Sequence, residues 1–369
     1  MIYVHTPYCR RKCSYCAFYS VATLQSKSDY VAAICREIDI RPWPNTAVET
    51  LYFGGGTPSL LSVEELATIV AALRRRHNLD HLREATIECN PDDLTPQYLS
   101  ELRQLDIFDR LSIGIQSFND DELALLRRRH TSKQALEAID NAALAGFCNI
   151  SIDLIYGLPG SSHASWQHTL DVAATLPSAV KHLSAYSLSV EPATLLCRQV
   201  EEQKLTPAPE EEVLGQYQTL LNWAARQGYQ QYEISNFAKP GHRSLHNSRY
   251  WTRHPYIGYG AAAHSFDGNY RRWNCSNIGL YISSLATGDA NHESEHLSPT
   301  DAYNEALLTG LRTTTGIDLE ALGQEQANLL LESAQPMVSN GLLTNEGGFL
   351  VPTEAGLLQA DGIAATLFR

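Results

Sequence analysis

The chain has 369 residues, 44% of them hydrophobic, and a formal net charge of −13 at pH 7. This length suffices for one large domain with a smaller appendage, and the acidic balance excludes tight nucleic-acid binding through a basic surface. No apolar run approaches the roughly 18 residues that a transmembrane helix needs, and the N-terminus carries no charged-then-apolar signal sequence. We therefore expect a cytoplasmic protein.

Six short segments with apolar or alternating patterns predict strands, and helical patterns separate them. The predicted strands are Ile2–His5, Thr50–Phe53, Ala85–Cys89, Leu111–Ile115, Asn149–Leu154 and His182–Tyr186. Strand and helix alternate with a period of roughly 30–40 residues, which is typical of βαβ units and a parallel sheet.

Capping residues indicate where the predicted helices begin and end. Ser62-Val63-Glu64-Glu65 is a capping box that opens a helix running to about Arg76. Three further caps and one closing glycine are predicted at Thr95, Asn119, Thr131 and Gly146.

The pattern changes from about Ser298. Helices are predicted over Tyr303–Leu311 and Leu329–Met337, a hairpin over Leu342–Val351 and a final helix over Thr353–Gln359. Helices followed by a hairpin indicate a small winged-helix-like α+β domain. We therefore expect one domain over residues 1–297, with its core over 1–230 and an extension over 231–297, and a second domain over 298–369.

Polar side chains lie at the carboxyl ends of three predicted strands. In each of these strands, alternation puts the polar residues on one face and the apolar residues on the other. Glu88, Gln116 and Asp153 are the last polar residues on that face. Because barrel enzymes build their sites at the carboxyl ends of the strands, and because a buried carboxylate needs a partner, we expect a polar lumen that holds a ligand.

Three cysteines, Cys9, Cys13 and Cys16, lie in one loop directly after the first predicted strand. Thiolates favour zinc, copper(I) or iron–sulfur clusters, and a structural zinc site usually needs four ligands. Three thiolates on a four-iron cluster leave one iron open. A zinc site completed by His5 or a distant residue, and thiols without any metal, are the alternatives.

The spacing Cys-x3-Cys-x2-Cys after Tyr3-Val4-His5 resembles the signature of the radical S-adenosylmethionine (SAM) superfamily. The resemblance implies a [4Fe-4S] cluster on Cys9, Cys13 and Cys16, whose open iron chelates SAM and whose electron yields a 5′-deoxyadenosyl radical. It also assigns Tyr3 to the SAM site and Tyr15 to the packing of the adenine.

Further segments match the superfamily in the same order along the chain. Phe53-Gly54-Gly55-Gly56-Thr57-Pro58 resembles the segment that receives the SAM amino group, and its glycines allow close backbone approach. The resemblance assigns these residues to the SAM site: Gly55, Gly56, Thr57, Glu88, Gln116, Arg128, which is expected in the helix after Gln116, and Asp153.

From end to end the chain resembles the anaerobic coproporphyrinogen III oxidase family and its close relatives, the HemW haem chaperones. This resemblance implies an α/β fold: a partial (β/α)6 TIM-like radical SAM barrel followed by the small C-terminal domain. The oxidases carry a further cysteine two residues beyond the third ligand, where this chain has Cys16-Ala17-Phe18. They also carry an N-terminal extension, for which Cys9 leaves no room.

His246-Asn247-Ser248-Arg249-Tyr250-Trp251 reproduces the HNxxYW motif of the haem chaperones. Histidine is a usual axial ligand of haem iron, and Tyr250 and Trp251 offer flat apolar surface to a porphyrin. The alternative for His246 is a hydrogen-bonded structural histidine. One departure is Ala17, because the chaperones usually have aspartate after the third cysteine.

The resemblance thus predicts a haem chaperone that carries a [4Fe-4S] cluster and SAM, binds haem and passes it to an acceptor apo-haem protein. A homodimer and a peripheral contact with membrane haem proteins stay open as partners, and nucleic acid is not expected. The alternative is an oxygen-independent coproporphyrinogen III oxidase that uses the radical for oxidative decarboxylation, or radical chemistry on another tetrapyrrole. Whether the chain is an enzyme is therefore left open.

Overall fold

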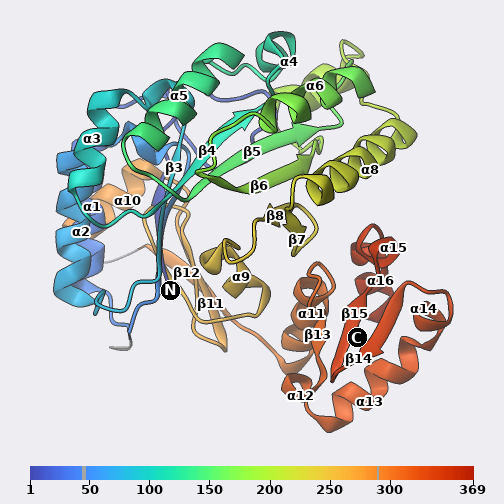
Figure 1. Cartoon of the computed structure of the whole chain (residues 1–369). Helices are drawn as coiled ribbons and strands as arrows, with labels where there is room; N and C mark the ends of the chain where they lie inside the picture. The colour runs from blue at the N-terminus through green and yellow to red at the C-terminus, as the bar shows by residue number, and fades with distance from the viewer. Residues whose placement is uncertain (44–46, 289–290) are drawn as a thin grey trace.

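The structure, a computed structural model, describes residues 1–43, 47–288 and 291–369. Its centre is a sheet with the strand order β7-β8-β6-β5-β4-β3-β2-β1-β9 (Figure 1). Strands β6 to β1 and β9 run parallel, whereas β8 is antiparallel to β6 and β7 is antiparallel to β8. The strands are β1 (Ile2–Thr6), β2 (Thr50–Gly55), β3 (Glu84–Cys89), β4 (Arg110–Gln116), β5 (Ile150–Tyr156), β6 (Val180–Ser187), β7 (Gln230–Gln231), β8 (Asn236–Ala238) and β9 (Ile257–Tyr259).

All six predicted strands are confirmed, each within two residues of its predicted ends. The sheet curves as a partial barrel that stays open, because β7 and β9 form its two edges rather than pairing with each other. The α/β fold class with a partial TIM-like barrel is therefore confirmed. Strands β7, β8 and β9 were not predicted, since they have only two or three residues each and come from a segment without alternation.

Helices cover the outer face of the sheet (Figure 1). They are α1 (Lys27–Ile40), α2 (Val63–Arg76), α3 (Pro96–Gln104), α4 (Asp120–Leu125), α5 (Ser132–Leu144), α6 (His163–Ala173) and α8 (Glu210–Arg226). Helix α7 (Leu195–Glu201) lies beside the cysteine loop, where the Leu196 N–H donates to the Ser14 carbonyl at 2.8 Å. The capping box at Ser62 is confirmed, since its hydroxyl accepts the Glu65 N–H at 3.2 Å and the Glu65 carboxylate accepts the Ser62 N–H at 2.8 Å. Thr95, Asn119 and Thr131 cap α3, α4 and α5 as predicted.

The register of the parallel strands places the predicted polar residues side by side on the inner face. Glu88 lies beside Ser112, and Gly114 lies beside Asp153. Alternating apolar residues such as Ile113 point to the helices and are fully buried in the main core. The polar lumen that alternation predicted is therefore present at the carboxyl ends of β3, β4 and β5.

The segment after β8 lies at the amino ends of the strands, opposite the polar residues at their carboxyl ends. Helix α9 (Leu245–Trp251) lies on the inner side of the sheet (Figure 1). The carboxylate of Glu84, at the start of β3, accepts the N–H groups of Leu245 at 2.7 Å and His246 at 2.9 Å, which holds the first turn of α9. β10 (His264–Phe266), β11 (Tyr270–Asn274) and β12 (His292–His296) then form a separate antiparallel sheet, with α10 (Ile278–Ala286) against α1.

The C-terminal part has its own hydrophobic core and the sheet order β13-β15-β14. Its elements are α11 (Pro299–Gly310), β13 (Ile317–Asp318), α12 (Leu319–Leu322), α13 (Gln324–Ser333), α14 (Gln335–Ser339), β14 (Leu343–Glu346), β15 (Phe349–Pro352), α15 (Glu354–Leu357) and α16 (Ala360–Leu367). The predicted hairpin is confirmed, and the whole is a small winged-helix-like domain. The helix predicted over Leu329–Met337 is instead two helices, α13 and α14, and Pro336 lies in the first turn of the second.

The two parts meet through backbone and charged contacts. Ile234 N–H donates to the Arg312 carbonyl at 2.9 Å, and Glu305 of α11 pairs with Arg253 and Arg271. The exact residue boundaries of the domains stay a prediction. Within the described ranges, no helix is long and apolar enough to cross a membrane.

Candidate functional site

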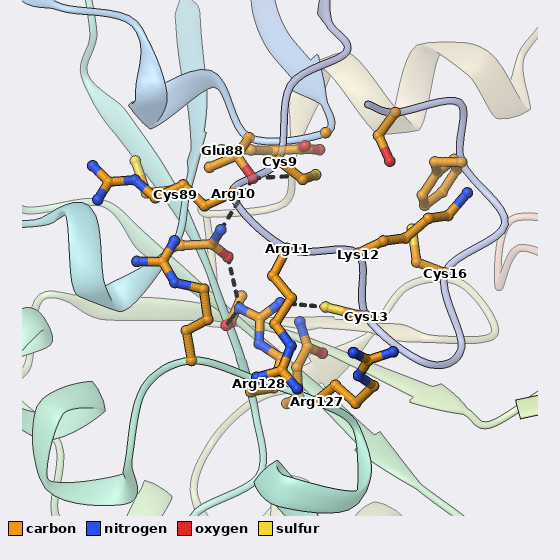
Figure 2. Close-up of a pocket in the computed structure, with 18 of the residues that line it drawn as sticks. Cys9, Arg10, Arg11, Lys12, Cys13, Cys16, Glu88, Cys89, Arg127 and Arg128 are labelled. Atoms are coloured by element: carbon orange, nitrogen blue, oxygen red, sulfur yellow. Dashed lines mark hydrogen bonds between the residues drawn. The ribbon is translucent and has the colours of Figure 1, made fainter. Parts of the chain in front are cut away.

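The cysteine loop lies at the carboxyl end of β1. Cys9, Cys13 and Cys16 are free thiols that line one pocket of about 150 Å³ (Figure 2). The Arg128 guanidinium donates to Cys13 Sγ at 3.4 Å, and the Thr57 hydroxyl donates to Cys9 Sγ at 3.6 Å. Burial raises the pKa of Cys9 and of Cys16. These donors would stabilise negative sulfur, which is the form that binds iron.

The glycine segment after β2 forms one wall of the pocket. Gly55 has φ +113°, and a Cβ there would lie 2.6 Å from the His5 ring. A Cβ on Gly56 would lie 2.6 Å from the Tyr8 carbonyl oxygen. Only glycine therefore fits at these positions, and the backbone N–H groups stay close to the pocket.

Glu88 is a buried carboxylate at the end of β3. Its Oε1 accepts the Tyr52 hydroxyl at 2.8 Å, and its Oε2 accepts the Gly55 N–H at 3.1 Å. Burial raises the pKa of Glu88 to about 7, although the two donors and the Arg110 guanidinium oppose this rise. The carboxylate thus sits near the point of ionisation at neutral pH and can pair with a cationic group of a ligand.

Arg128 connects three sides of the pocket. Besides Cys13, its guanidinium donates to Asn90 Oδ1 at 2.6 Å and to the Gly114 carbonyl at 2.5 Å. The expectation that Arg128 lies in a helix was wrong, because α4 ends at Leu125 and Arg128 lies in irregular backbone after a turn at residues 126–127. The turn brings the guanidinium inward, with Arg127 at φ +59°.

Gln116 and Asp153 complete the wall formed by β4 and β5. Gln116 ends β4 with φ +76°, an uncommon conformation for a residue other than glycine, and strain of this kind concentrates at functional sites. The Ser112 hydroxyl donates to Asp153 at 3.4 Å, and burial raises the pKa of Asp153. Tyr15 also lines the pocket from the cysteine loop.

The structure brings together all the predicted cluster and SAM residues except Tyr3. The pocket is lined by Cys9, Cys13, Cys16, Tyr15, Gly55, Gly56, Thr57, Glu88, Gln116, Arg128 and Asp153. Tyr3 lies deeper in the lumen, where its hydroxyl bonds to His5 Nδ1 at 3.0 Å and its ring stacks on Tyr52. Tyr3 is therefore not part of the pocket wall, and its assignment to the SAM site stays a prediction.

The donor set fits a multi-iron cluster with SAM better than a single metal ion. Within residues 1–43, 47–288 and 291–369, no three His, Cys, Asp or Glu side chains converge to hold one ion. His5 cannot complete a zinc site as it stands, because its two ring nitrogens lie 3.0 Å from the Tyr3 hydroxyl and 3.3 Å from the Tyr19 carbonyl. A cluster with several irons does not need its thiolates to meet at one point.

The charges around the pocket mouth suit a zwitterionic ligand. Six cationic side chains line it although the chain as a whole is acidic: Arg10, Arg11, Lys12, Arg127, Arg128 and Arg129. Three carboxylates also line the pocket: Glu88, Asp153 and Asp92, which pairs with Arg129. SAM has a carboxylate and two cationic groups, so both signs find a partner here.

Sequence reasoning missed Tyr52, Asn90 and Arg110. Asn90 bridges the pocket, since its amide donates to Thr57 at 3.0 Å and its carbonyl oxygen accepts from Arg128. Arg110 is almost fully buried at the start of β4, where it opposes the charge of Glu88. Alternation could have found Tyr52, because it shares a strand face with Thr50 and Gly54.

The predicted haem residues lie on α9 and have two different surroundings. His246 is fully buried: its Nδ1 lies 2.9 Å from the Thr50 hydroxyl and its Nε2 lies 3.0 Å from the Tyr250 hydroxyl. Both ring nitrogens are thus engaged, as in the structural alternative, and iron ligation would require both contacts to break. Trp251 is half-buried and lies elsewhere, at a second cavity.

The partial barrel with three loop cysteines and a lumen pocket defines a radical SAM protein. The radical SAM superfamily model matches residues 3–173, and the HemN C-terminal domain model matches residues 297–358. The structure of the coproporphyrinogen III oxidase HemN from Escherichia coli superposes with a TM-score of 0.84 over 100% of this chain and 89% of that one. At 23% identity this likeness shows the shared fold.

Comparison with curated proteins gives the family within this class. The heme chaperone HemW of Bacillus subtilis is 33% identical over 98% of this chain and 97% of its own length. HemW of Mycobacterium tuberculosis H37Rv is 33% identical over 99% and 94%. The mitochondrial radical S-adenosyl methionine domain-containing protein 1 of Bos taurus is 32% identical over 99% and 86%. This chain belongs to the HemW family of radical SAM proteins.

Proposed function

We propose that this protein is a haem chaperone, which binds haem and passes it to an acceptor apo-haem protein. The observation that carries the proposal is the near full-length similarity to proteins named heme chaperone, in Bacillus subtilis and Mycobacterium tuberculosis. The HNxxYW segment and the absence of a cysteine two residues after Cys16 support the same reading. We place this activity in the cytoplasm, where thiols stay reduced.

In this proposal, the SAM pocket is the binding site of a resident cofactor. Cys9, Cys13 and Cys16 would hold a [4Fe-4S] cluster, which would supply an iron site for SAM and an electron for its reductive cleavage. Arg128 and Thr57 stabilise the thiolates through their donors to Cys13 and Cys9. Glu88 holds a cationic group of SAM.

The residues of the lumen also fix the orientation and the ionisation of Glu88. Tyr52 and the Gly55 N–H fix both oxygens of Glu88, so the carboxylate keeps one orientation. The charge of Asp153 raises the pKa of Glu88, whereas the Arg110 guanidinium lowers it. Glu88, Tyr52 and Asp153 are buried, and burial strengthens each of these interactions.

A haem titration tests the proposed function. Anaerobically reconstituted protein is mixed with increasing haemin, and the Soret band is followed, first alone and then with a haem-free acceptor such as apomyoglobin. We expect a saturable Soret shift and then transfer to the acceptor. A wild-type protein without any Soret shift would overturn the proposal, and decarboxylation of coproporphyrinogen III by the reduced protein would favour the oxidase alternative.

A further inference from the structure

The two faces of α9 point to different spaces. His246 and Tyr250, four residues apart, face the lumen. Trp251, Ser248 and Thr252 instead line a cavity of about 690 Å³ that lies against α11 and β13 of the C-terminal domain. A cavity of this size is within the range of small-molecule sites. It is separate from the SAM pocket, since the two share no lining residue.

The cavity combines aromatic surface with two arginine side chains, of which Arg253 pairs with Glu305 and Arg243 has no ion pair among the described residues. Its aromatic residues are Tyr232, Trp251, Tyr303 and Phe349. Arg243 and Arg253 also line it, and the single carboxylate among the lining residues, Asp318, accepts the N–H groups of Glu320 and Ala321 at the start of α12. In a chain of net charge −13, this lining fits a ligand with a flat apolar body and negative groups.

Several polar groups at this cavity lack a protein partner. Trp251 Nε1 and Arg253 Nη2 are buried, and no hydrogen-bond partner for them exists among the described residues. The Arg243 guanidinium lies 5.5 Å from the Tyr232 ring, and no described carboxylate pairs with it. Arg253 also has φ +53°. Unsatisfied buried donors and a strained backbone together indicate a ligand site.

We propose that this cavity binds the haem, with the macrocycle against Trp251 and the propionates on Arg243 and on the Nη2 of Arg253, whose Nε pairs with Glu305. The proposal rests on the proposed function, because haem is the ligand that the chaperone role requires. Haem has the two properties that the cavity selects: a planar apolar ring and two carboxylates on one edge. The C-terminal domain would thus form one wall of the haem site.

Haemin titration of three variants tests the cavity. Trp251→Ala removes the aromatic wall and Arg243→Glu reverses a cation that has no ion pair, whereas Arg226→Glu makes the same charge change on α8, outside the cavity. We expect the first two to weaken haem affinity about tenfold, which corresponds to about 1.4 kcal/mol, and the third to bind as the wild type does.

The outcomes separate this proposal from the proposed function. A wild type that binds no haem contradicts both. A wild type that binds haem, with Trp251→Ala and Arg243→Glu equally tight, contradicts the cavity alone, as does an equal loss in all three variants. If Trp251→Ala fails to fold, Arg243→Glu decides, because Arg243 is exposed and its replacement leaves the core intact.

A second inference rests on the contacts of the lumen face. The His246 ring stacks on Tyr52 with a centroid distance of 5.0 Å and an interplanar angle of 27°. Tyr52 in turn donates to Glu88, and Thr50 and Tyr250 fix the two nitrogens of His246. We infer that His246 is a positioning residue of the SAM pocket, which holds Tyr52 so that its hydroxyl reaches Glu88.

His246→Ala and His246→Phe test this positioning role. Loss of the ring frees Tyr52, so we expect His246→Ala to weaken SAM binding several-fold, whereas His246→Phe, which keeps an aromatic ring on Tyr52, recovers most of it. Haem absorbance is measured on the same samples. Unchanged SAM affinity in His246→Ala, or a changed haem ligand spectrum with normal SAM binding, would contradict the inference and favour iron ligation by His246.

Discussion

Replacement of Tyr52 by Phe isolates one hydrogen bond beneath the SAM pocket. The change keeps the ring that stacks on His246 and removes only the hydroxyl that donates to Glu88 at 2.8 Å. The Gly55 N–H still donates to the other carboxylate oxygen. Because the lost donor stabilises the ionised form alone, Tyr52→Phe should raise the pKa of Glu88.

The magnitude follows from the burial of this pair. A hydrogen bond to a charged group contributes about 1.5–3 kcal/mol, and one pKa unit corresponds to about 1.4 kcal/mol. The pKa of Glu88 should therefore rise from about 7 by about one to two units. Other groups that face Glu88 are unchanged in this variant: Tyr3, Arg110, Asp153, Tyr186 and Tyr250.

The assay is equilibrium binding of SAM to unreduced, reconstituted protein across a pH series that spans neutrality. Ionised Glu88 attracts the cationic groups of SAM, so affinity should rise as the pH passes the pKa of Glu88. In Tyr52→Phe the midpoint should move to higher pH. Tyr229→Phe, which loses a hydroxyl bonded to Val180 far from the pocket, is the matched control. An unmoved or lowered midpoint in Tyr52→Phe would refute this reasoning.

Three further changes have defined expectations. Gly55→Ala should abolish SAM binding, because its Cβ would meet the His5 ring at 2.6 Å; normal binding by calorimetry would contradict this. Ser62→Ala should lower the free energy of unfolding by about 1 kcal/mol through loss of the capping box, measured by urea denaturation; no change would show that the cap is dispensable. Burial of Glu88 should make the protein lose stability as the pH rises from the unfolded pKa of 4.5 to about 7, whereas Glu88→Gln should flatten that slope; an equal slope in both would exclude Glu88 as its source.

Local patterns were sufficient to predict the barrel strands, the cysteine loop and the polar residues at the strand ends, whereas the family resemblance supplied the other pocket residues. Alternation in β3, β4 and β5 put Glu88, Gln116 and Asp153 on one face, and the parallel register then gathered them at one edge. The cysteine spacing located the loop without any tertiary information. These features depend on short stretches of chain and on the rule that parallel strands end at the same edge.

The parts that were missed depend on contacts between distant segments. β9 pairs with β1 across more than two hundred residues, and α9 enters the lumen because Glu84 holds its first turn. The HNxxYW motif alone could not show that His246 faces the lumen whereas Trp251 lines the cavity against the C-terminal domain. Arg128 was placed in a helix because the pattern did not reveal that Arg127 adopts φ +59° and ends it.

The most direct test of the central claim is haem transfer by the reconstituted protein. Haem-loaded protein is mixed with apomyoglobin, and the growth of the holomyoglobin Soret band is compared with transfer from free haemin at the same concentration. We expect saturable loading and directed transfer, with loading weakened by Arg243→Glu. Absence of loading, or turnover of coproporphyrinogen III by the same preparation without haem transfer, would contradict the assignment as a haem chaperone.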